Sequence, residues 1–210
     1  MNSGFANPRE TWDARFARDD YIFGTAPNVF LTTQRTRLAL GQRALCVADG
    51  EGRNSIWLAQ QGLAVTAFDI SPIGVDKARR MAAAQGVTVD LHVAAAEDWN
   101  WTPAAYDVVA AIFIQFAPPD LRERMFAGML GTLKPGGWLL LQGYTPRQLE
   151  YRTGGPPCAE HLYTLELLQR AFAAHDIVEL RQHDDELSEG TQHAGMSALI
   201  DCVVRKTGAA

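Results

Sequence analysis

Short apolar runs alternate with longer segments of helical spacing along most of the 210-residue chain. The runs are rich in β-branched residues or continuously apolar, which predicts strands, and the longer segments place apolar side chains on one face, which predicts helices. The expected strands are residues 44–47, 63–68, 87–93 and 107–114, and the expected helices are residues 55–61, 72–85 and 118–133. Strands that alternate with helices in this way predict parallel βαβ units.

The pattern changes after the Lys-Pro-Gly-Gly turn at residues 134–137, because Pro cannot continue the preceding helix. A fifth strand, a loop, a helix and two final strands are expected at residues 138–144, 145–159, 164–174, 177–183 and 197–205. The final two strands are joined only by a loop that includes residues 188–190, which predicts an antiparallel pair. The sequence therefore predicts one doubly wound, Rossmann-like α/β domain, with a mostly parallel seven-stranded sheet that ends in an antiparallel C-terminal strand.

Residues 1–40 precede the first strand and mix aromatic with acidic side chains that the sheet does not require. We expect this segment to be a cap that packs on a core domain of residues 41–210. Within the cap, either Trp12, Phe16 and Tyr21 pack a short helix on the domain, or Tyr21 contributes to a binding site.

The charge balance limits the class of partner. The chain contains 19 Lys and Arg against 24 Asp and Glu, without a basic cluster, so no nucleic acid is expected as a partner. It contains neither a secretory signal nor a run of membrane-spanning length. Cys46, Cys158 and Cys202 lack the spacing of a disulfide framework or a zinc site. We therefore expect a cytoplasmic protein that acts on a small molecule, binds no metal and has no membrane partner; the sequence indicates no oligomeric state.

A turn of small residues follows the first strand, and it contains Gly50 and Gly52. Glycine permits a positive φ and a close approach of a ligand to the backbone. Asp69 ends the next strand, 19 residues after Gly50, where nucleotide sites place a carboxylate on ribose hydroxyls. The alternative is a tight turn followed by a helix that Asp69 caps.

The turn distinguishes between nucleotides. Dinucleotide sites have a third glycine where this chain has Ser55, and their pyrophosphate would be repelled by Asp49 and Glu51. A cationic ligand such as S-adenosylmethionine (SAM), which contains a sulfonium and an ammonium group, is favoured by these acids.

The segment GEGRNSIWLAQQGLAVTAFDISPIGVDKARRM resembles the first and second motifs of class I SAM-dependent methyltransferases, with the nearest likeness to the tellurite-resistance (TehB-like) family. The resemblance continues through YDVVAAIFIQFAPPDLRERMFAGMLGTLKPGGWLLLQGY, and SALIDCVVRK is similar to the family's final strand. It covers about residues 43–144. The chain differs from the family pattern at Cys46, where an acid is common, and at Ala48, where the first glycine is usual.

The resemblance implies roles for individual residues. Asp49, Gly50 and Gly52 would lie along the methionine and ribose, Asp69 would bind the ribose hydroxyls, and Tyr21 would be a lid residue. The remaining cofactor candidates are Glu51 and Asn54 in the turn, Ile70 beside adenine, Glu97 and Asp98 on its amino group, and Ile112 and Phe113 on the floor of the site.

The acceptor is expected to be a small nucleophile such as a thiol or an oxyanion. A thiolate or an oxyanion needs no general base, and the sequence indicates no catalytic residue. Candidate acceptor-side residues follow the fifth strand or lie near the final hairpin: Tyr144, Arg147, Arg152, His161, Tyr163, His183 and His193. Two other functions remain open, namely a non-catalytic SAM-binding protein and an NAD-dependent oxidoreductase.

Overall fold

The computed structural model describes residues 7–208, so the first six residues of the predicted cap and the last two of the predicted core domain lie outside the described residues. Seven strands form one sheet in the order β3-β2-β1-β4-β5-β7-β6. The strands are β1 (Arg43–Val47), β2 (Ala64–Asp69), β3 (Asp90–Val93), β4 (Tyr106–Ile112), β5 (Leu133–Tyr144), β6 (Asp176–Glu189) and β7 (His193–Arg205). The neighbours from β3 to β5 are parallel, whereas β7 is antiparallel to both β5 and β6. This confirms the predicted fold class.

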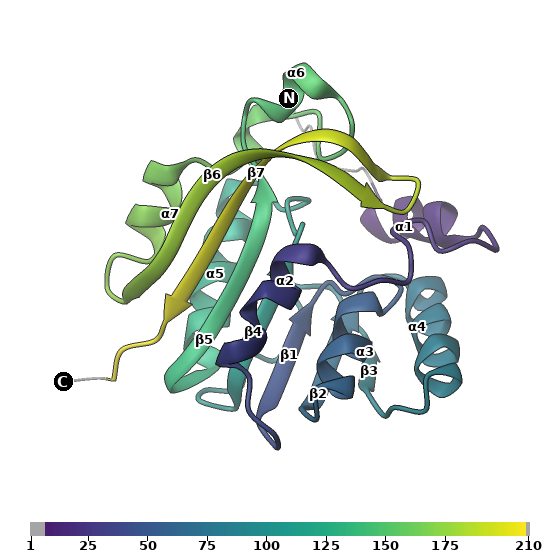
Figure 1. The fold of residues 1–210 in the computed structure, drawn as a ribbon, viewed down its shortest axis with the longest axis horizontal. Helices are drawn as coiled ribbons and strands as arrows, with labels where there is room; N and C mark the ends of the chain where they lie inside the picture. The colour runs from purple at the N-terminus through teal and green to yellow at the C-terminus, as the bar shows by residue number, and fades with distance from the viewer. Residues whose placement is uncertain (1–6, 209–210) are drawn as a thin grey trace.

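Helices cover both faces of the sheet (Figure 1). They are α1 (Pro8–Phe16), α2 (Val29–Thr33), the 3-10 turn η1 (Gln34–Arg37), α3 (Arg53–Gln60), α4 (Pro72–Ala84), α5 (Pro119–Thr132), α6 (Gln148–Tyr151), the 3-10 turn η2 (Ala159–His161) and α7 (Leu165–Ala171). Alternate strand residues point to opposite faces. Leu45 and Val109 therefore pack with α5 and α7, whereas Cys46 and Val108 pack with α2 and α3.

The strand boundaries differ most from the sequence prediction in β3, in β5 and in the hairpin of β6 and β7. The strand β3 begins at Asp90 rather than at residue 87, and β5 begins at Leu133, before the Pro-Gly-Gly turn. The strands β6 and β7 are much longer than predicted and pair as far as Glu189 and His193. The middle of β6 is polar and exposed, as suits the edge of a sheet, so its composition resembles that of a loop.

The hairpin of β6 and β7 reaches the N-terminal segment (Figure 1). The backbone N–H groups of Thr191 and Gln192 donate to the carbonyl of Ile22 at 2.9 and 3.1 Å. A Cβ at Gly190 would lie 2.4 Å from the backbone nitrogen of Gly24, so the two turns are in close contact. The N-terminal segment and the hairpin tip thus meet above the ends of the central strands.

No helix among residues 7–208 is both long enough and apolar enough to cross a membrane.

Candidate functional site

A cleft of about 990 Å³ opens at the carboxyl ends of β1, β2 and β4. Open α/β sheets bind ligands at this edge, where neighbouring crossovers diverge. The turn after β1 and the ends of β2 and β4 form its floor, while α1, the hairpin tip and the loop of residues 154–157 form its opposite wall. The cleft is thus built from segments far apart in the sequence.

The turn from β1 to α3 has an unusual backbone. Ala48, Gly50 and Gly52 have φ values of +49°, +60° and +93°. A positive φ is costly for alanine, and such strain is concentrated at functional sites. Ala48 and Gly50 line the cleft, but Gly52 does not. A Cβ at Gly52 would lie 2.7 Å from the Cβ of Ala78, so this glycine permits the packing of α3 against α4.

Asp69 fastens the first turn to the second strand. Its Oδ2 accepts a hydrogen bond from the Gly50 N–H at 2.9 Å, and its Oδ1 accepts one from the Ser71 N–H at 2.9 Å. The helix cap of α4 is Ser71, whose hydroxyl accepts from the Gly74 N–H at 3.1 Å. Asp69 lines the cleft, and each carboxylate oxygen has a further lone pair for a ligand. Burial raises the pKa of Asp69 to about 6.

Asp49 is the second acid of the cleft. Its carboxylate accepts hydrogen bonds from the hydroxyl and the N–H of Ser55. Burial raises the pKa of Asp49 to about 7, and Asp69 adds to the effect. Ser55 stands where dinucleotide sites have their third glycine. In this chain, its two hydrogen bonds orient the carboxylate of Asp49. Two acids of raised pKa in one cleft favour a cationic ligand.

The other predicted cofactor residues divide into two groups. Residues that line the cleft are Asn54, Ile70, Glu97, Ile112 and Phe113. Three do not: Asp98 is exposed, and Glu51 and Tyr21 contact Lys77 of α4. The Glu51 carboxylate pairs with Lys77 Nζ at 2.5 Å, and the Tyr21 hydroxyl donates to the Lys77 carbonyl at 3.3 Å. Tyr21 therefore fastens the N-terminal segment to α4, and Glu51 fastens the turn after β1 to α4.

Two of the predicted acceptor-side residues, Tyr144 and His193, line the cleft. The ring of Phe113, itself at φ +55°, stacks on Tyr144 with 4.7 Å between centroids and meets His193 edge-on at 4.4 Å. The Tyr144 hydroxyl and His193 Nδ1 are buried, and within residues 7–208 neither has a hydrogen-bond partner. The Tyr144 hydroxyl and the His193 imidazole are therefore candidates for contact with a ligand.

The structure does not bring the remaining acceptor-side candidates to the cleft. Arg147 pairs with Asp184, and Arg152 is exposed. Tyr163 is buried in the core beside Phe126. His183 lies on β6, where its Nε2 is 2.9 Å from a carboxylate oxygen of Asp201 on β7.

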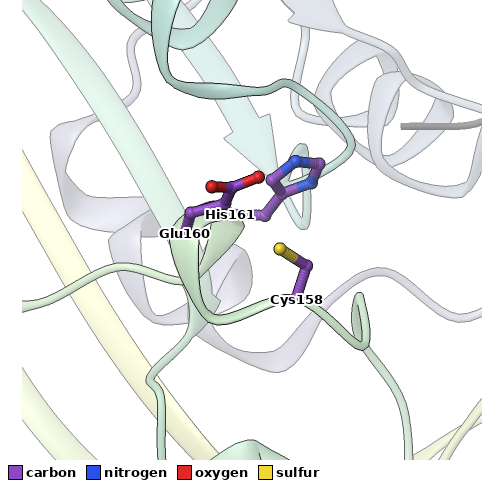
Figure 2. Close-up of side chains that lie close together, drawn as sticks. All are labelled: Cys158, Glu160 and His161. Carbon is purple, nitrogen blue, oxygen red and sulfur yellow. The ribbon is translucent and has the colours of Figure 1, made fainter. Parts of the chain in front are cut away.

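His161 lies in η2, and its potential ligand atom is within 4.8 Å of those of Cys158 and Glu160 (Figure 2). Thiolate, imidazole and carboxylate are ligands that Zn²⁺ accepts. Two of the three are neighbours in one short turn, however, so their proximity follows from the local sequence. Within the described range 7–208, this is the one cluster of His, Cys, Asp and Glu with the spacing to hold a metal ion.

Several cleft residues were not predicted from the sequence. Trp12, Arg15 and Phe16 of α1, with Phe23 after it, form the wall that Tyr21 was expected to supply. The i, i+4 spacing of Trp12 and Phe16 was a usable signal, since it places both rings on one face of a helix. Gln192 at the hairpin tip, which accepts a hydrogen bond from Arg15 at 3.0 Å, had no sequence signal.

Glu189 connects the elements around the acceptor side. Its carboxylate accepts from Arg53 at 2.7 Å, from the Asn28 side chain at 3.1 Å and from the Val29 N–H at 3.2 Å. Burial opposes the ionisation of Glu189, but His193 and Arg53 outweigh it and lower the pKa to about 2. An ionised carboxylate therefore lies at the base of the hairpin tip.

Comparison with known proteins identifies a domain within the chain. Residues 44–137 match the family model described as a methyltransferase domain. The chain is 37% identical over 108 residues to a ubiquinone biosynthesis O-methyltransferase from Xanthomonas euvesicatoria pv. vesicatoria, and the match covers 50% of this chain and 45% of the relative. The chain thus spans less than half the length of this curated relative.

Solved structures share the fold at low sequence identity. TehB from Haemophilus influenzae aligns with 95% of this chain and 67% of its own, at a TM-score of 0.70 and 12% identity. The N-methyltransferase NodS from Bradyrhizobium japonicum, solved with S-adenosyl-L-homocysteine, aligns over 95% and 98% at a TM-score of 0.70 and 14% identity. TehB is therefore one of several structures of similar likeness.

Proposed function

The chain contains a class I SAM-dependent methyltransferase domain, and from this premise we propose that it binds SAM in the cleft and transfers the methyl group to a small nucleophilic acceptor. The observation that supports this most directly is the buried carboxylate of Asp69, fixed by Gly50 at the ends of the central strands. The acceptor types expected from the sequence, a thiol, an oxyanion or a similar small nucleophile, remain part of the proposal, as does a cytoplasmic location.

The cleft residues fit SAM in shape and charge. Ligand sites have volumes of about 300 to 1,000 Å³, and the cleft lies at the upper end of this range at about 990 Å³. Asp69 would hold the ribose hydroxyls, Asp49 would face the positively charged methionine portion, and Ile70, Ala94 and Glu97 would surround the adenine. In this arrangement Asp49 and Asp69 face the cationic and hydroxyl-bearing parts of SAM. The apolar side chains of Ile70 and Ala94 pack against the flat adenine ring.

When bound, SAM supplies an electrophilic methyl group on a sulfonium sulfur. The residues of the chain then have to orient the acceptor in line with that methyl group and exclude water. Positioning of this kind contributes about 7–11 kcal/mol in favourable cases. The aromatic wall formed by Trp12, Phe16 and Phe23 on one side and Phe113 and Tyr144 on the other would perform both tasks.

Calorimetric titration with SAM, S-adenosyl-L-homocysteine and NAD tests the proposal. Asp69→Ala should weaken binding of both adenosyl ligands by about 10- to 100-fold, because it removes acceptors for two hydroxyls, each worth about 1 kcal/mol or more. Asp98→Ala is the matched control, since this acid is nearby but exposed, and it should bind like the wild type.

The titration, together with a methyl-transfer assay, also separates the three candidate functions. Binding of NAD without binding of SAM would reject the proposal in favour of an oxidoreductase. Binding of SAM without methyl transfer to any member of a panel of thiols, metalloid oxyanions and small phenols would favour a non-catalytic SAM-binding protein.

A further inference from the structure

His193 is a buried titratable residue at the acceptor side of the cleft. Its side chain is only 9% exposed, and its Nδ1 lies 3.8 Å from Glu189 Oε2. The buried Nδ1 has no hydrogen-bond partner among the described residues. Since Nδ1 faces the carboxylate, Nε2 is the ring nitrogen that remains for a ligand. A carboxylate at this distance stabilises a positive charge on the imidazole, which favours its acting as a base.

The charged and titratable groups around His193 come from four elements. They are Glu189 on β6, Arg53 on α3, Arg15 on α1 and Tyr144 on β5. Burial lowers the pKa of His193 from its ordinary value, and Arg53 and Arg15 act in the same direction against Glu189. The imidazole is therefore neutral at pH 7 and able to accept a proton. Burial raises the pKa of Tyr144, so its hydroxyl stays protonated and is not a competing base.

Aromatic rings surround the imidazole. The ring centroids of Phe23, Phe113 and Tyr144 lie 4.5, 4.4 and 5.8 Å from that of His193. Trp12 and Phe16, stacked at 5.4 Å, extend this wall. Flat apolar ligands pack well between such rings, and offset or edge-on ring pairs add about 0.5–1.5 kcal/mol each.

The charges at this end of the cleft disfavour an anionic acceptor. Arg53 is already paired with Glu189, and Arg15 lies over the Trp12 ring and donates to Gln192. The ionised Glu189 lies directly behind His193. A neutral acceptor that has a proton to lose is therefore a better match than an oxyanion.

We infer that His193 is the general base of the proposed methyl transfer, and that the acceptor is a neutral aromatic compound with a ring hydroxyl. This inference rests on the proposed function. In the step, His193 Nε2 takes the hydroxyl proton while the oxygen forms a bond to the methyl carbon. The carbon–sulfur bond breaks, and sulfur keeps its electron pair as a neutral thioether. Glu189 stabilises the imidazolium, which afterwards releases the proton to water.

A chromogenic phenol tests the inference without turnover. 4-Nitrophenol would be titrated into the protein saturated with S-adenosyl-L-homocysteine, slightly below the phenol's own pKa. The site favours the neutral phenol, whose hydroxyl donates to His193 Nε2, so the visible phenolate band should decrease on binding in the wild type. His193→Gln should bind S-adenosyl-L-homocysteine as the wild type does but should give a smaller decrease in the band. His92→Gln, which alters an exposed histidine outside the cleft, should behave as the wild type.

Steady-state kinetics provide the second readout. General-base catalysis contributes about 10²- to 10⁴-fold, so His193→Gln should lower kcat by this factor with a phenol that is protonated at the assay pH. The KM for SAM should stay unchanged. With a nitrophenol assayed above its own pKa, the loss in kcat should nearly vanish. The kcat of the wild type should fall at low pH as His193 is protonated, and this limb should be absent in His193→Gln.

The outcomes separate this inference from the proposed function. If S-adenosyl-L-homocysteine does not bind, the proposed function fails. If it binds but 4-nitrophenol does not, or the band decreases equally in the wild type and in His193→Gln, the assignment of His193 is overturned. A decrease that survives in His193→Gln but is lost in Tyr144→Phe would place the phenol hydroxyl on Tyr144 and overturn the assignment of His193.

Discussion

At the scale of single residues, Asp49 and Asp69 have raised pKa values chiefly because both are buried in the cleft, and Asp69 adds to the effect on Asp49. The cleft is therefore partly protonated near neutral pH. Asp49 is held by Ser55, and Asp69 is held by the N–H groups of Gly50 and Ser71. Binding of a cation and donation from ribose hydroxyls both favour the ionised forms, so proton release should accompany binding.

We predict that the affinity for SAM increases with pH. The pKa values of Asp69 and Asp49 in the free protein are about 6 and 7. Below these values the acids must lose protons before they bind a cation, so the association constant should fall by up to about tenfold per pH unit for each proton released. Calorimetry in two buffers of different ionisation enthalpy would count the protons.

S-adenosyl-L-homocysteine, which lacks the sulfonium charge, is the matched ligand for this experiment and should show a weaker pH dependence. A SAM affinity that stays constant across the pKa values of the two acids would show that neither changes its protonation on binding.

Sequence reasoning found the glycine turn and the acid at the end of β2 because both depend on local chain geometry. Gly50 and Asp69 lie where spacing predicted, with their atoms 2.9 Å apart. The sequence did not indicate that Tyr21 packs against Lys77 of α4 and not on the cleft, because no local pattern distinguishes these two positions of an aromatic ring. Nor did it indicate Phe23, which reaches the cleft only through tertiary packing.

At the scale of elements, the contact between the hairpin tip and the N-terminal segment closes the acceptor side of the cleft. Two glycines make this contact: Gly190 has φ +73°, and Gly24 has φ +72°. A side chain at position 190 would meet the backbone of residues 22–24 within 2.4–2.5 Å. The backbone of residues 22–24 cannot move aside to make room for a Cβ, as a flexible side chain would.

Gly190→Ala should therefore destabilise the protein by about 2–4 kcal/mol, the sum of left-handed strain and overpacking. Chemical denaturation monitored by circular dichroism would measure the free energy of unfolding. Gly131→Ala is the control, because this helical glycine has open space around its Cβ position, and it should be neutral or stabilise by up to about 1 kcal/mol. Equal stabilities of the two variants would mean that the tip contact contributes little.

Sequence reasoning predicted the parallel strands well and the hairpin poorly. The central strands are buried on both faces and therefore have continuous apolar sequences, as in β4. The outer half of β6 is mostly exposed, and its segment His183–Glu186 has the composition of a loop. Only the pairing with β7 makes that segment a strand.

At the scale of the whole molecule, residues 7–40 do not form a separate layer. Leu31 and Phe30 of α2 are buried in the same cluster as Val108 of β4 and Leu58 of α3. The Asn28 side chain donates to Gln142 on β5 at 2.7 Å. The predicted division between a cap of residues 1–40 and a core of residues 41–210 therefore separates groups that pack together.

A pair of truncations tests that division. We predict that residues 28–210 still unfold cooperatively but bind SAM more weakly, since they keep α2 and lose the wall formed by α1. Residues 41–210 should lose the cooperative transition, because removal of buried side chains as large as Phe or Leu costs about 2–5 kcal/mol each. Thermal unfolding followed by circular dichroism would compare them. A cooperative transition of residues 41–210 near that of the full chain would support a separate cap.

The two borders of the sheet have a consequence for the behaviour of concentrated solutions. At one border β3 is only four residues long, and at the other the edge strand β6 contains the exposed acids Asp185 and Glu186. A short strand offers few backbone groups to a second molecule, and exposed acids on an edge strand repel the same acids of an identical strand. Both borders thus oppose growth of the sheet from one molecule to the next, which protects the protein against fibrous aggregation.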